Sequence, residues 1–91
     1  MQWNVSAGML RQMLEKDPGI PVIDLRDPED YGQIGFRTIP VLHYEVSNSL
    51  DLFSGRKQAV FYCRSGSRSA SVINYLRQVH NIGIQMYSLI I

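Results

Sequence analysis

The chain has 91 residues, of which 45% are hydrophobic, and its formal net charge is +1. This length predicts one domain over residues 1–91 with a modest core. A charge so near zero excludes a strong field that would attract nucleic acid or a membrane surface. No apolar run approaches the roughly 18 residues of a membrane-spanning helix, so we expect neither a nucleic acid nor a membrane as a partner.

Hydrophobic periodicity predicts strands and helices that alternate along the chain. Ser6 is a favoured N-cap residue ahead of a helical apolar stripe, and Pro28 fits the first turn of a short helix. Residues 20–25 form a continuous apolar run, as in a strand buried on both faces of a parallel sheet. The predicted strands are residues 2–5, 20–25, 38–42, 59–62 and 86–89, and the predicted helices follow Ser6 and cover residues 28–33, 45–53 and 69–80.

This alternation predicts an α/β fold, a three-layer α/β/α sandwich. A mostly parallel sheet of about five short strands would carry helices on both sides, joined by right-handed crossovers. Ligands of such sheets bind at the carboxyl ends of the strands. Two polar stretches follow predicted strands at that edge: Asp24-Leu25-Arg26 and the residues that begin with Cys63.

Cysteine and histidine usage restricts the chemistry of the site. Cys63 is the only cysteine, so the chain can form neither an internal disulfide nor a multi-cysteine metal site. His43 and His80 are isolated and have no partner at metal-ligand spacing, so we expect no metal. A free thiol suits a reducing compartment, and the N-terminus lacks the pattern of a secretory signal. We therefore expect a cytoplasmic protein.

The segment around Cys63 carries the strongest functional signal. Four apolar residues precede the cysteine, small polar residues and two arginines follow it, and a helical pattern begins at Ser69. A strand, a tight loop and a helix aim several backbone amides and a helix N-terminus at one point. An ordinary cysteine is only about 3% thiolate at pH 7, and these groups favour the reactive anion. Cys63 is therefore the candidate nucleophile.

The residues after Cys63 are candidate anion ligands. Gly66 permits a positive φ in the loop, and the guanidinium of Arg68 suits a sulfonate or another oxyanion. A phosphate would fit the same loop, so the loop alone does not name the substrate. The predicted anion-binding residues are Arg64, Ser65, Gly66, Ser67 and Arg68.

Three further residues are expected behind this loop: Asp24, Arg26 and Ser69. In the functional interpretation, Asp24 and Arg26 orient the Cys63 loop. In the structural interpretation, Asp24 caps nearby amides and Arg26 pairs with Glu29. The sequence favours the structural role for Asp24 and leaves both roles open for Arg26.

The segment from Cys63 to Ser69, CRSGSRS, resembles the active-site loop of rhodanese-family sulfurtransferases, Cys-x-x-Gly-x-Arg-Ser. Asp24-Leu25-Arg26 resembles the Asp-x-Arg motif of that family, and residues 86–89 resemble its last core strand. The similarity runs over about residues 5–89. Residues 33–40 lack the family's usual histidine and are similar to rhodanese domains fused to adenylyltransferases of molybdopterin and thiamine biosynthesis.

The resemblance implies a sulfurtransferase that needs no cofactor. Cys63 would take the outer sulfur of thiosulfate or of a protein persulfide and pass it to an acceptor thiol, cyanide or a sulfur-carrier protein. Two alternatives remain: a non-catalytic interaction module, and a cysteine phosphatase. Phosphatases of similar fold have one residue more between cysteine and arginine than the four between Cys63 and Arg68, and a smaller loop suits a sulfur atom better.

The resemblance also predicts an uncovered surface. In the family a further helix follows the last strand, whereas this sequence has only Ile90 and Ile91 after it. We expect either that the chain is a fragment of a longer protein or that a partner covers the gap. Self-association through this end, giving a homodimer, is the corresponding hypothesis.

Overall fold

A computed structural model describes residues 3–32 and 34–91. Five strands form one sheet in the order β1-β5-β4-β2-β3, and every neighbouring pair is parallel. The strands are β1 (Trp3–Ser6), β2 (Val22–Asp24), β3 (Ile39–Pro40), β4 (Gln58–Tyr62) and β5 (Gln85–Ile90). The α-helices are α1 (Ala7–Lys16) and α2 (Ser67–Gln78), and the 3-10 helices are η1 (Pro28–Asp30) and η2 (His43–Phe53).

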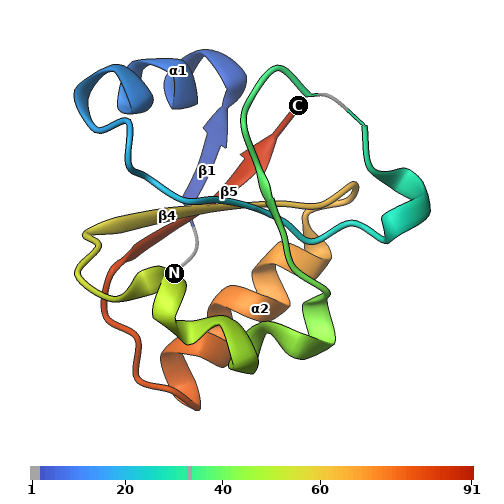
Figure 1. Ribbon diagram of the computed structural model, residues 1–91, viewed down its shortest axis with the longest axis vertical. Coiled ribbons are helices and arrows are strands. Elements are labelled where there is room, and N and C mark those ends of the chain that lie inside the picture. Colours follow the sequence, from blue (N-terminus) through green and yellow to red (C-terminus); the bar gives the residue numbers. More distant parts are fainter. Residues whose placement is uncertain (1–2, 33) are drawn as a thin grey trace.

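Helices cover both faces of this sheet (Figure 1), so the predicted three-layer α/β/α architecture is confirmed. The three middle residues of the central strand β4 are all apolar. Ala59 and Phe61 pack into the core beneath α2 and η2, whereas Val60 packs into the core beneath α1. All three are fully buried, because a central parallel strand has no face in contact with water.

Several boundaries differ from the predicted ones. The helix after the cysteine begins at Ser67 rather than Ser69. The predicted helix 45–53 is a 3-10 helix from His43 to Phe53, interrupted at Ser49, where φ is −121°. The short helix predicted over residues 28–33 is the 3-10 turn η1. Gln2 and Gln33, which the predictions included, lie outside the described residues.

The N-cap at Ser6 is confirmed. Its Oγ accepts a hydrogen bond from the amide of Met9 at 3.1 Å, which satisfies one of the free donors in the first turn of α1. None of the described helices is long and apolar enough to cross a membrane.

Apolar side chains are exposed near the end of β5. Ile90 and Ile91, at the end of the strand, are 48% and 66% exposed, and Trp3, which pairs with Tyr87 earlier along β5, is 43% exposed. The ring of Trp3 lies 5.5 Å from that of Tyr87 on β5. Association of two copies through the C-terminal end, at Ile90 and Ile91, stays a prediction.

Candidate active site

The register of two parallel strands brings the two predicted motifs together. Asp24 at the end of β2 is paired with Tyr62 at the end of β4, and the amide of Leu25 donates to the carbonyl of Tyr62 at 2.8 Å. Cys63 directly follows Tyr62, and Arg26 comes two residues after Asp24. They therefore lie side by side at the carboxyl edge of the sheet, where ligands of open α/β sheets bind.

The sulfur of Cys63 is surrounded by hydrogen-bond donors. It accepts from the amide of Gly66 at 3.1 Å, from the amide of Ser69 at 3.3 Å and from the hydroxyl of Ser69 at 3.2 Å. A thiolate is a far better acceptor than a thiol, so this geometry fits the anion.

These donors change the acidity of Cys63. Burial is the largest single influence and disfavours the anion, because Cys63 is only 4% exposed. The opposing hydrogen bonds come from the Ser69 hydroxyl and from the amides of Ser69, Gly66 and Arg68, and together they lower the pKa of the thiol below its ordinary value. A lowered pKa increases the fraction of thiolate, the nucleophilic form, at neutral pH.

The local backbone explains this arrangement. Gly66 has a φ of +83°, in the left-handed region, and it is the N-cap of α2. Glycine has no side chain with which to cap the helix. The sulfur of Cys63 replaces that cap, because it accepts the amide of Ser69 in the first turn. The hydroxyls of Ser65 and Ser67 bond each other at 2.8 Å, and Ser65 Oγ also accepts the amide of Ser67.

The two arginines of the loop are both paired. Arg68 Nη1 donates to the carbonyl of Leu25 at 2.9 Å and to Asp27 Oδ1 at 3.0 Å. Arg64 Nη1 donates to Asp30 Oδ1 at 3.2 Å. Arg68 therefore joins the Cys63 loop to the segment after β2.

Asp24 and Arg26 form a buried ion pair. Arg26 Nε and Nη2 donate to Asp24 Oδ1 and Oδ2 at 3.0 and 2.7 Å, and Asp24 Oδ1 also accepts the amide of Arg26. Arg26 Nη2 also donates to the carbonyl of Gly32, and its guanidinium lies 4.9 Å from the ring centre of Tyr62. The capping role of Asp24 is thus present, but the partner of Arg26 is Asp24, so the pairing with Glu29 was wrong. Arg26 pairs with Asp24 because the tertiary fold directs its side chain inward over Tyr62.

A cavity of about 150 Å³ opens beside the sulfur. It is lined by Cys63, Arg64, Ser65, Ser67 and Arg68 from the loop and by Arg26, Asp27 and Asp30 after β2. Gly66, Ser69 and Asp24 are not lining residues: the first two donate to the sulfur, and Asp24 holds Arg26. Asp27 and Asp30 were not predicted as site residues, although both follow the Asp-x-Arg motif at the edge where ligands bind.

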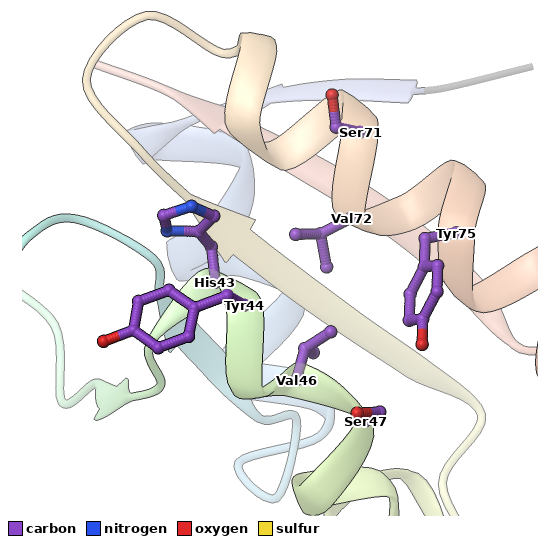
Figure 2. A pocket seen from close by; sticks show the side chains of 7 residues that line it. All are labelled: His43, Tyr44, Val46, Ser47, Ser71, Val72 and Tyr75. Carbon is purple, nitrogen blue, oxygen red and sulfur yellow. The ribbon is translucent and has the colours of Figure 1, made fainter.

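A second hollow lies between η2 and α2 (Figure 2). It has a volume of about 350 Å³ and is lined by His43, Tyr44, Val46, Ser47, Ser71, Val72 and Tyr75. Cys63 is not among these residues; it lines the smaller, more polar cavity described above. Over residues 3–32 and 34–91, no cluster of three or more histidine, cysteine or acidic side chains is arranged to hold a metal ion.

Known proteins resemble this chain in sequence and in fold. No protein-family model matches it. It is 30% identical over 74 residues to "Putative sulfurtransferase YtwF" of Bacillus subtilis (strain 168), a match that covers 79% of this chain and 71% of that protein. Its fold is similar to that of a rhodanese homolog, TT1651, from the extremely thermophilic bacterium Thermus thermophilus, with a TM-score of 0.67, 20% identity, and coverage of 98% of this chain and 93% of that one. The chain therefore belongs to the rhodanese-like family of sulfurtransferase domains.

Proposed function

We propose that this rhodanese-like domain is an active sulfurtransferase that carries sulfane sulfur as a persulfide on Cys63. The observation that supports this most is the set of donors around one sulfur atom: the amides of Gly66 and Ser69 and the hydroxyl of Ser69. They are fixed before any substrate arrives, so they stabilise negative charge on sulfur without reorganisation.

The proposed reaction has two steps. In the first, the thiolate of Cys63 attacks the outer sulfur of thiosulfate; a sulfur–sulfur bond forms, and sulfite leaves with the electron pair of the broken bond. A protein persulfide reacts in the same way: Cys63 takes its outer sulfur, and the donor cysteine leaves as a thiolate. In the second, a nucleophilic acceptor takes the terminal sulfur and restores the Cys63 thiolate. We propose an acceptor thiol, either of a small molecule or of a protein that carries sulfur as a persulfide, with cyanide as a laboratory substitute.

Charge at the cavity favours sulfur transfer from a singly charged donor, such as a protein persulfide, over phosphoryl transfer. A phosphatase needs a guanidinium that is free to hold phosphoryl oxygens, whereas Arg68 is held by Leu25 and Asp27. The carboxylates of Asp27 and Asp30 also line the cavity and would repel a phosphate dianion. The second candidate function, a non-catalytic interaction module, gains no specific support from the donors around Cys63.

The test is thiocyanate formation from thiosulfate and cyanide. The wild-type chain should turn over, and Cys63→Ser should not, although serine keeps the size of the side chain. Hydrolysis of an aryl phosphate by the wild type without thiocyanate formation would identify a phosphatase. No reaction with thiosulfate, an organic persulfide or an aryl phosphate would favour the interaction module.

A further inference from the structure

We propose that Asp30 sets the donor specificity of this site, so that the cavity disfavours doubly charged sulfur donors relative to singly charged ones. The inference rests on the proposed function. It comes from the pairing of charges around the cavity, which leaves no lining arginine free to neutralise a second negative charge.

Each arginine that lines the cavity forms an ion pair with a different aspartate. Arg26 pairs with Asp24 at 2.7 Å, Arg68 with Asp27 at 3.0 Å and Arg64 with Asp30 at 3.2 Å. These six side chains sum to a formal charge of zero. A donor therefore meets a neutral ring of side chains and, at its centre, the negative sulfur of Cys63.

The backbone donors do not change this conclusion. The amides of Gly66 and Ser69 already bond the sulfur of Cys63, and they compensate the charge of that atom. A second charge on the donor has no such partner. Coulomb energy is proportional to the product of the charges. A change of one unit charge at the cavity therefore changes the free energy of a bound dianion twice as much as that of a monoanion.

Among the three carboxylates, Asp30 is the one whose loss would free a cation. Asp24 is buried and holds Arg26 by two nitrogens. Arg68 would keep its bond to the carbonyl of Leu25 without Asp27. The side chain of Arg64 is 74% exposed, and its ion-pair partner within the described ranges is Asp30. Without the Asp30 carboxylate, Arg64 could turn its charge toward a donor.

The best test compares two donors of the same chemistry and different charge. Thiosulfate is a dianion, and methanethiosulfonate is a monoanion in which a methyl group replaces one oxygen. Cys63 attacks the outer sulfur of either; the first releases sulfite and the second methanesulfinate. The measured quantity is the second-order rate constant for persulfide formation on Cys63.

Asp30→Asn should raise this rate constant about tenfold for thiosulfate and about threefold for methanethiosulfonate, the effect of one unit charge about 6 Å from the donor in a water-like dielectric. Asp51→Asn is the matched control, because it makes the same change at an exposed position of η2 that lines a different hollow. It should change neither rate constant by more than about twofold.

Arg64→Gln removes the positive member of the Arg64–Asp30 pair, so its effect should have the opposite sign. It should lower the thiosulfate rate constant about tenfold. The double variant Asp30→Asn with Arg64→Gln has the same local charge as the wild type, so its preference between the two donors should return to the wild-type value. Equal factors for the two donors in Asp30→Asn, or no change for either, would overturn the proposal.

Alkylation of Cys63 separates this inference from the proposed function. Iodoacetate and iodoacetamide differ by one negative charge and need no sulfur-transfer activity. Asp30→Asn should raise the ratio of their rates about threefold, and Asp51→Asn should leave it unchanged. A chain that forms no persulfide with any donor would refute the proposed function, and an unchanged alkylation ratio would refute the role of Asp30.

Discussion

Ser69 contacts the sulfur of Cys63 twice, through its hydroxyl at 3.2 Å and through its amide at 3.3 Å. Ser69 is fully buried, so its hydroxyl has no water with which to exchange this bond. The two contacts act on the same atom in the same direction, toward the thiolate. The Ser69 hydroxyl is the largest of the influences that oppose burial of the thiol.

Ser69→Ala should raise the pKa of Cys63 by about one unit, because it removes one hydrogen bond to an ionised group and keeps the backbone amides. The pH dependence of iodoacetamide alkylation measures this pKa. Ser71→Ala, on the same helix but lining the hollow of Figure 2, is the control and should leave the pKa unchanged. An unchanged pKa in Ser69→Ala would show that the hydroxyl does not stabilise the thiolate.

The lowered pKa of Cys63 also links stability to pH. Between the folded pKa and the ordinary thiol pKa, the unfolded chain binds more protons than the folded chain, so stability rises with pH. The free energy of unfolding of the wild type, relative to Cys63→Ser, should increase across this window and level off above the ordinary thiol value. This added stability should be lost as the pH falls through the folded pKa. Urea unfolding at a series of pH values checks this, and a difference that falls as the pH rises would contradict it.

Gly66→Ala should destabilise the fold by about 1 kcal/mol, because an L-residue at a φ of +83° is strained. Space is not the obstacle: an added Cβ would lie 3.7 Å from Ile90 Cδ1, an ordinary contact. Strain at this residue would also turn its amide away from the sulfur, so Cys63 alkylation at neutral pH should slow several-fold. Gly83→Ala is the control, since its Cβ would meet no atom within 4 Å and its φ is not positive. Equal stability of the two variants would refute the argument from φ.

The ion pairs around the cavity should contribute very differently to stability. Asp24→Asn leaves the charge of buried Arg26 without its carboxylate and should cost about 3 kcal/mol. Arg64→Gln breaks the exposed pair with Asp30 and should cost less than about 1 kcal/mol. Urea unfolding of both variants makes the comparison. Similar losses would mean that the Asp24–Arg26 pair is not a structural support of the site.

The position of the site was predictable from local patterns. An apolar run before Cys63 predicts a buried strand, and a second such run before Asp24 predicts its neighbour. Parallel strands bring the residues after their carboxyl ends to the same edge of the sheet, so the two motifs meet. The positive φ of Gly66 and the cap at Ser6 also depend only on nearby residues, and both were predictable.

The partners of the arginines were not predictable, because they depend on contacts between distant segments. Arg68 bonds Leu25 and Asp27, more than forty positions away in the chain. No periodicity encodes such a contact. Likewise, an apolar pattern over residues 45–53 predicts a helix but does not separate a 3-10 helix from an α-helix, and the irregular residue Ser49 within η2 has no local signal.

The most direct test of sulfur transfer through Cys63 is the intact mass of the chain after incubation with thiosulfate or methanethiosulfonate. The wild type should gain the mass of one sulfur atom and lose it again when cyanide is added, and Cys63→Ser should gain nothing. An unchanged wild-type mass with both donors, or the same gain in Cys63→Ser, would contradict a persulfide on this residue.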